Sequence, residues 1–398
     1  MRSSALLAMA LCLLALTWVE GRTDPATGKC RVLYVGQWPY VGRPQYLIED
    51  PLLETSVIPY HDFGAQLDQI RRYMHLRYPR SYGHLVKNYD LVFFSNIQHL
   101  AFTPAQLKMV SDGVVKEGIG FIMTGGHTSF GGTENWYPTW RTTSVYSILP
   151  VDPIDGIYLR PVVFKLLVTD PGHELMKSLP WDKIPLFTYT LNEATVKQGS
   201  HELARTDLKE GWPVLAYGDI GEGRSIAFMT PINVVDNKNL KDWGFFDDMC
   251  ANMVYYGCRI KLPEDPIRIH ELRKMFRSYY DQRLLYLSVV DFADKFGANT
   301  QSLEKKLKQI DSIKAESYRA YIEQDFESSS RLMKQAIDEL REGQGDAVRL
   351  KRRAMLWIYI VEWLVVTATL MVTGSILWAV MVRRRLYREI ATTRWNSR

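Results

Sequence analysis

Short apolar runs alternate with amphipathic segments through the first third of the chain. The runs are predicted strands, at residues 31–36, 57–60, 89–94 and 119–123. Helices are predicted at residues 65–76 and from Thr103 onward, where an N-cap residue precedes Pro104 in the first turn. Strands alternating with helices predict an α/β fold with a doubly wound, mainly parallel sheet.

The strand at residues 119–123 runs into a glycine turn at Gly125 and Gly126, followed by His127, Thr128 and Ser129. Ligands of open α/β sheets bind where the parallel strands end. The glycine turn and the ends of the other predicted strands therefore supply the ligand-binding candidates. These are Gly125, Gly126, Trp38, His61 and Asn96, joined by Trp136 after the turn.

Two interpretations of the polar side chains at this edge stay open. In the catalytic one, Ser129 is a nucleophile while His127 and Asp62 act as acid–base or orienting groups, which requires hydrogen-bond reach among them. In the structural one, Ser129 caps the turn and His127 bonds to backbone. The aromatic residues after the turn have a similar pair of roles, as a packed lid or as a stacking surface for sugar or peptide. We favour the structural role in each case.

The motif Gly-Gly-x-x-Ser-Phe-x-Gly at residues 125–132, with Ile-Leu-Pro-Val at 148–151, resembles the putative glutamine amidotransferase family of the class I glutamine amidotransferase-like superfamily. The resemblance covers about residues 29–258 and implies a flavodoxin-like fold. Enzymes of this class carry a nucleophilic cysteine in a Gly-x-Cys-x-Gly elbow. Here Gly125 and Gly126 occupy the elbow and no cysteine lies near, so we expect no amidotransferase chemistry.

Further strands are predicted at residues 159–168, 185–196, 214–217 and 224–229, followed by a helix ending near Gly257. Segment 263–353 is then rich in charge and is predicted to form a helical stalk. Its first helix covers 267–296, Gly297-Ala298-Asn299 breaks it, and an apolar stripe from Leu303 to Leu340 predicts one continuous second helix. The two helices form an antiparallel hairpin, whose stripe closes an intramolecular seam or, alternatively, joins homo-oligomers.

Both ends of the chain carry membrane-related signals. Residues 1–21 resemble a cleaved secretory leader, and residues 354–382 form a predicted span with a charge-free stretch at 363–382. The arginines of the tail at 383–398 predict a cytoplasmic C-terminus and an extracytoplasmic α/β domain at 22–262. Glu362 is expected to be a solvated interfacial carboxylate, the alternative being a contact with a partner helix.

Charge and cysteine content narrow the function further. The formal net charge of +5 is carried by the tail, so the exported part is near neutral and nucleic-acid binding is not expected. No His/Cys spacing predicts a metal site, and no cofactor is expected. Once Cys12 leaves with the leader, we expect Cys30, Cys250 and Cys258 to be unpaired buried thiols, although a Cys30–Cys258 disulfide is the alternative.

Taken together, these patterns predict a single-pass membrane protein of the cell membrane with a non-catalytic amidotransferase-like domain. Its expected role is binding or assembly with other membrane or cell-surface proteins. The alternative is a hydrolase that acts on a small amide, ester or carbohydrate through His127 and Ser129.

Overall fold

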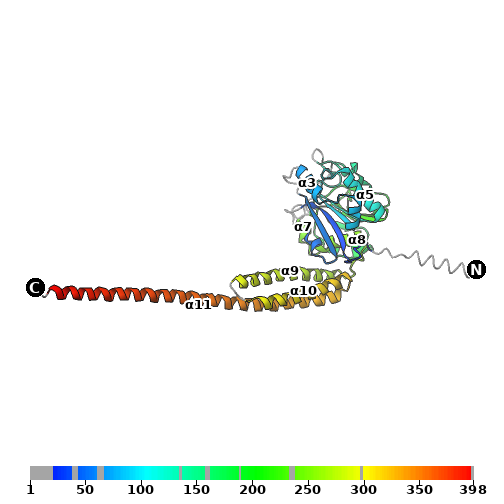
Figure 1. Ribbon diagram of the computed structural model, residues 1–398. Coiled ribbons are helices and arrows are strands. Elements are labelled where there is room, and N and C mark those ends of the chain that lie inside the picture. The colour runs from blue at the N-terminus through cyan, green and yellow to red at the C-terminus, as the bar shows by residue number, and fades with distance from the viewer. Residues whose placement is uncertain are drawn as a thin grey trace, which may run out of the picture. The chain divides into compact units, whose positions relative to one another are not determined.

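The computed structural model describes residues 21–37, 44–60, 67–133, 137–156, 162–187, 190–232, 238–295 and 299–395. The chain forms two compact units (Figure 1). The α/β unit comprises Met1–Phe276 with Tyr318–Ser329, and the helical unit comprises Arg277–Ser317 with Ser330–Arg398.

The α/β unit is built on an eight-stranded sheet in the order β2-β1-β3-β4-β10-β9-β8-β6. The five strands from β2 to β10 are parallel neighbours, and β9, β8 and β6 continue the sheet antiparallel. The mixed α/β class with a largely parallel sheet is therefore confirmed. The strand bounds are β1 Cys30–Gln37, β2 Leu53–Tyr60, β3 Leu91–Ser95, β4 Gly120–Thr124, β6 Leu166–Val168, β8 His201–Thr206, β9 Pro213–Ile220 and β10 Gly223–Phe228.

The antiparallel half of the sheet differs most from the prediction. Only Leu166–Val168 (β6) and Ala194–Val196 (β7) form strands in the two long segments predicted around them, and part of each segment lies outside the described residues. Strand β7 pairs with β5 (Val151–Pro153) in a separate two-stranded sheet. Strand β8 was not predicted, because its sequence HELART has too few apolar residues to stand out.

Helix α5 shows how local sequence sets an element. The side chain of Thr103 accepts from the backbone N–H of Gln106, the Gln106 side chain accepts from the Thr103 N–H, and Pro104 opens the helix. The helix ends at Gly118, whose φ of 73° suits a residue without Cβ. The other helices of this unit are α2 Gln45–Ile48, α3 Leu67–Arg77, α4 Tyr82–Asn88, α6 Glu174–Lys177, α7 Lys238–Asp242 and α8 Phe246–Gly257.

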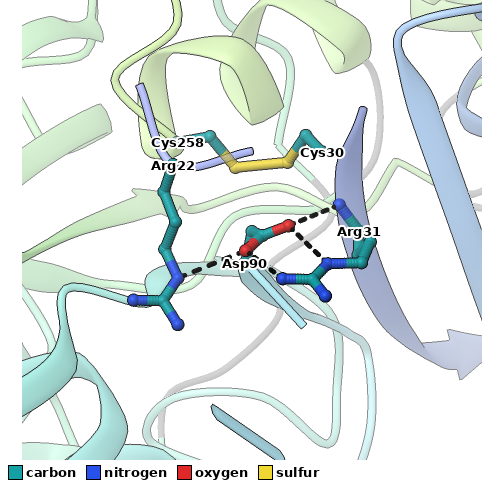
Figure 2. The surroundings of a disulfide bond; sticks show 5 residues. All are labelled: Arg22, Cys30, Arg31, Asp90 and Cys258. Carbon is teal, nitrogen blue, oxygen red and sulfur yellow. Dashed lines mark hydrogen bonds and ion pairs between the residues drawn. A yellow bond between two sulfur atoms is a disulfide. The ribbon is translucent and has the colours of Figure 1, made fainter. Parts of the chain in front are cut away.

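A disulfide joins Cys30 at the start of β1 to Cys258 directly after α8 (Figure 2). The expectation of three unpaired thiols was wrong, and the Cys30–Cys258 alternative is correct. The two cysteines are 228 residues apart in the sequence, and the fold brings the start of β1 next to the end of α8. Only Cys250, buried within α8, is a free thiol among the described cysteines.

An ionic cluster lies beside this disulfide (Figure 2). The buried carboxylate of Asp90 accepts from Arg31 Nε at 2.9 Å and from Arg31 Nη2 at 2.9 Å. Arg22 forms a second ion pair with it at 3.3 Å. The disulfide holds the start of β1 to the end of α8, and the ion pairs hold Arg22 and Arg31 to Asp90, directly before β3.

The predicted two-helix stalk is in fact three helices, α9 Pro266–Lys295, α10 Gln301–Ile322 and α11 Phe326–Trp395. In the helical unit, α9 and α10 are antiparallel, with Tyr286 Oη donating to Leu303 O at 2.8 Å and Tyr279 Oη donating to Asp311 at 2.6 Å. Helix α11 packs against α9 as the third helix, with Gln344 Nε2 donating to Gln282 O at 3.1 Å.

The expectation of one helix through residues 303–340 was wrong because the chain breaks between α10 and α11. Gln324 has a φ of 62°, and the Asp325 side chain accepts from the Ser328 N–H as a helix cap. Ile322 and Phe326 keep helical spacing across the break, so the apolar stripe gave no sign of it. Among the described residues, α11 is the one helix long and apolar enough to cross a membrane by length and composition.

Candidate functional site

The candidate site is the turn that follows β4. This strand has five buried residues and lies between β3 and β10 in the parallel part of the sheet. At its end, the Gly125 N–H donates to Phe228 O at 2.8 Å, which carries the ladder one residue further. A Cβ on Gly125 would lie 2.6 Å from both Met229 O and Asn192 Oδ1. The turn therefore excludes any side chain at the first glycine.

Gly126 excludes a side chain for two separate reasons. Its φ is 140°, outside the range that L-residues adopt comfortably, and a Cβ would lie 2.1 Å from Asn96 Oδ1. A cysteine at either elbow position would thus require its neighbours to move. The backbone at both glycines is packed too tightly to accept a side chain unless its neighbours move.

Two asparagines fix the turn. Asn192 Oδ1 accepts from the Gly126 N–H at 2.8 Å, and Asn192 Nδ2 donates to Gly126 O at 3.1 Å. Asn96 Oδ1 accepts from the Thr128 N–H at 3.1 Å and from Thr128 Oγ1 at 2.9 Å. Asn96 itself has a φ of 45°, a conformation that asparagine tolerates better than most residues. Both asparagine side chains are neutral, and each forms hydrogen bonds with backbone groups of the turn.

The two catalytic candidates in the described part of the turn differ in environment. Ser129 is fully buried, and its Oγ has no hydrogen-bond partner, so the prediction that its hydroxyl caps the turn was wrong. His127 is half-buried, with its ring 5.5 Å from that of Tyr137, and its carbonyl accepts from Thr133 Oγ1 at 2.9 Å. Because no base contacts Ser129 Oγ among the described residues, this arrangement does not activate the hydroxyl.

The aromatic residues after the turn pack into the domain where they are described. Trp140 is fully buried, its Nε1 donates to Thr128 O at 2.9 Å, and its ring lies 5.7 Å from Phe94. The His99 ring lies 5.7 Å from Trp140, and burial lowers the pKa of this histidine. The packing role predicted for these aromatics is confirmed for Trp140.

Four predicted site residues, Trp38, His61, Asp62 and Trp136, lie outside the described residues. The structure does bring Gly125, Gly126 and Asn96 together, as the strand-end argument expects. Sequence reasoning missed Asn192, which reaches the turn from the segment after α6 and carries no local signal. In the described part of the chain, no group of three or more His, Cys, Asp or Glu residues could hold a metal ion.

Residues 83–256 match the family model described as "Putative glutamine amidotransferase". The predicted family resemblance is confirmed. The match is shorter than the predicted range of 29–258, and it contains both the glycine turn and Asn192. No curated protein matches the chain.

Solved structures give more distant similarities to the amidotransferase-like domain. The cytoplasmic proteins STM3548 and STM1381 from Salmonella typhimurium are 19% and 20% identical, with TM-scores of 0.46 and 0.47. Their matches cover 56% and 57% of this chain and 98% and 99% of theirs. A β-galactosidase from Rahnella sp. R3 is 12% identical with a TM-score of 0.34, covering 59% of this chain and 32% of the enzyme. Similarities at this level carry no information on activity.

A second buried polar centre of the α/β unit lies away from the glycine turn, around Arg273 of α9. Arg273 Nε donates to Asp50 at 3.0 Å, and Arg273 Nη1 donates to Asp248 at 2.8 Å. The hydroxyls of Tyr255 and Tyr321 donate to Asp50 at 2.7 and 3.1 Å. This Arg273 cluster joins segments that lie far apart in the sequence.

The cluster contains two buried carboxylates and one guanidinium. His270 also contacts this cluster, with its Nδ1 2.7 Å from Asp248 Oδ2. Burial opposes the charge on Asp248, but the hydrogen bond from His270 and the Arg273 guanidinium outweigh it and hold the Asp248 pKa below its usual value. The two carboxylates of this cluster are thus compensated within the buried setting by ion pairs and hydrogen bonds.

Proposed function

We propose that the chain is a membrane-anchored, extracytoplasmic protein whose amidotransferase-like domain binds or assembles with other cell-surface proteins and performs no amidotransferase chemistry. The observation that carries this proposal is the glycine turn. Gly125 and Gly126 stand where the enzymes have their elbow, and Asn96 and Asn192 occupy the space next to them. The site is stabilised as a structural turn.

We also infer a flavodoxin-like arrangement for the domain. The supporting feature is the order β2-β1-β3-β4-β10 of the parallel strands, which follows the 2-1-3-4-5 order of that fold. In this order the chain reverses direction across the sheet between β1 and β3. Asn96 follows β3 and therefore lies near that switch point.

An extracytoplasmic location is supported by the Cys30–Cys258 disulfide, because disulfides persist mainly in oxidising compartments. Membrane anchoring is supported by α11, with its charge-free stretch at residues 363–382 and the arginines that follow. The leader at residues 1–21 lies almost wholly outside the described residues and stays a prediction.

The activity part of the proposal is tested with the purified full-length chain in detergent. We expect no ammonia release from glutamine above the buffer rate, while an authentic class I amidotransferase gives a signal under the same conditions. Glutaminase activity that disappears in Ser129→Ala would contradict the proposal and favour the hydrolase alternative, which no observation on the described residues supports at present.

The location is tested by counting thiols in intact cells and after denaturation. We expect one thiol, Cys250, to react with maleimide in the denatured, non-reduced chain and three to react after reduction.

Added protease should degrade the α/β unit and leave the C-terminal tail protected. Three reactive thiols without reduction, or protection of the α/β unit, would contradict the extracytoplasmic location.

A further inference from the structure

Helix α11 continues without a break from Phe326 to Trp395, so positions along its apolar segment can be placed by helix geometry. Two arginine groups bound this segment, Arg352 with Arg353 at one end and residues 383–385 at the other. Thirty residues separate Arg353 from Arg383, which is about 45 Å along a helix. A bilayer with its headgroups is about 40–45 Å thick. Both arginine groups therefore fit the headgroup layers at the same time.

This register places Glu362 inside the hydrocarbon. The midpoint between Arg353 and Arg383 is residue 368, and a hydrocarbon core of about 30 Å takes about ten residues on either side. Glu362 then lies about 6 Å inside the edge of the core. It is the one charged residue between positions 354 and 382.

Helix α11 offers Glu362 no cation one helical turn away. The positions one helical turn away are Ile358, Tyr359, Val365 and Val366, and none of them is a cation. A carboxylate in this layer is costly unless another group compensates it, and membrane proteins usually do so with a group on a neighbouring helix. The Glu362 side chain is exposed on the helix surface, so such a helix can reach it.

Further polar and small residues share the face of Glu362. With about 100° per residue, a stripe within about 40° of Glu362 continues through Val366, Thr369, Thr373 and Ile376. The hydroxyls of Thr369 and Thr373 donate to backbone carbonyls one turn earlier, so they add no unsatisfied group to the stripe. Small side chains of this kind allow close approach of a second membrane helix.

We propose that this stripe docks a membrane helix of a different protein, and that a Lys or Arg of that helix pairs with Glu362. The proposal rests on the membrane span of the proposed function and names the partner's chemistry. A second copy of this chain, running parallel, would bring a second Glu362 to the same depth and oppose like charges. Charge complementarity therefore favours a basic partner over self-association.

The test uses the full chain in the membrane of the cells that make it, with photoreactive benzoylphenylalanine in place of Val366 or of Leu364. Val366 lies on the Glu362 face, whereas Leu364 points to the opposite side. We expect the probe at 366, and not the probe at 364, to cross-link to a protein whose apolar span contains Lys or Arg. Glu362→Gln should lower the yield of the cross-link from position 366 about three- to thirtyfold. The control Glu323→Gln, which removes an exposed charge before α11, should leave it unchanged.

Rescue gives the decisive result. Glu362→Lys should abolish the cross-link, and exchange of the partner's basic residue for Glu should restore it. A cross-link to a second copy of the chain, a partner span without a basic residue, adducts to lipid alone, or a yield unaffected by Glu362→Gln would each overturn the proposal. Alkaline extraction separates the two failures. A chain released from the membrane disproves the span itself, whereas an integrated chain without Glu362 dependence disproves only the pairing.

Discussion

The glycine turn and the Arg273 cluster are both buried polar centres of the α/β unit, but they are stabilised by opposite chemistry. The turn is held by neutral amides, with Asn192 bonded to both backbone groups of Gly126. The cluster is ionic, with Arg273 between the carboxylates of Asp50 and Asp248. The comparison shows that one unit of the fold buries polar groups in two ways, by neutral amide hydrogen bonds at the glycine turn and by ion pairs around Arg273.

The difference also predicts how each centre fails. Removing one partner of a buried ionic cluster leaves charge uncompensated, which is among the most destabilising changes a domain can suffer. Crowding a glycine turn introduces strain and overlap, a smaller effect. Removing a hydroxyl that bonds to nothing should change almost nothing. The four predictions below test this order.

The largest effect is expected for Arg273→Met. This change leaves Asp50 and Asp248 buried without their guanidinium, and their side chains are only 2% and 4% exposed. We expect a loss of about 3–5 kcal/mol in the free energy of unfolding, measured by urea denaturation of the full-length chain in detergent. The matched control is Arg283→Met, whose ion pair with Asp311 is about one-third exposed and should cost at most about 1 kcal/mol. Equal losses in the two variants would show that the Arg273 cluster is no more than a surface ion pair.

The next effect is expected for Gly126→Ala. Residue 126 has a φ of 140°, which an alanine adopts only with backbone strain of about 1–3 kcal/mol. The new Cβ would also overlap Asn96 Oδ1, which adds a cost of overpacking. Thermal melts should show a lower midpoint than the parent. Gly83→Ala is the control, because its Cβ would lie in open space within α4. If both variants melt with the parent, the tight geometry of the turn is wrong.

A pH effect of intermediate size is expected from Asp248. Its pKa is lower in the folded state than in the unfolded chain, so the unfolded state binds more protons in the acid range. The stabilisation is therefore complete above the usual aspartate pKa of about 3.9 and is lost as pH falls through the lower, folded value. Urea midpoints measured between neutral and acid pH should fall less steeply in Asp248→Asn than in the parent. Parallel pH profiles for the two proteins would remove Asp248 from the acid-sensitive groups.

The smallest effect is expected for Ser129→Ala. Its Oγ is buried without a hydrogen-bond partner, so removing it loses no bond and relieves the desolvation of a polar atom. The free energy of unfolding, measured by thermal melts, should stay within about 1 kcal/mol of the parent's. The variant and the parent should not differ in activity. A clear loss of stability would instead indicate that the hydroxyl makes a bond, which would reopen its role at the turn.

Sequence reasoning reached the parallel half of the sheet and the glycine turn because both follow local rules. Buried parallel strands are continuous apolar runs, and a strand that ends in Gly125-Gly126 signals a turn whatever surrounds it. It did not reach β8, the break at Gln324, or the role of Asn192. Strand β8 has too few apolar residues, the apolar spacing continues across the break at Gln324, and Asn192 meets the turn from a segment distant in the chain.

The sequence by itself determined the α/β class, the absence of a cysteine from the Gly125-Gly126 turn and the presence of an apolar segment long enough to cross a membrane. These are properties of periodicity and residue identity, which need no partner. Only the tertiary structure decided that Cys30 pairs with Cys258 and that Arg273 lies between Asp50 and Asp248. Cys30 and Cys258 are more than 200 residues apart in the sequence, and so are Asp50 and Arg273. At such separations the fold of the whole chain, and not a local preference, decides which groups meet.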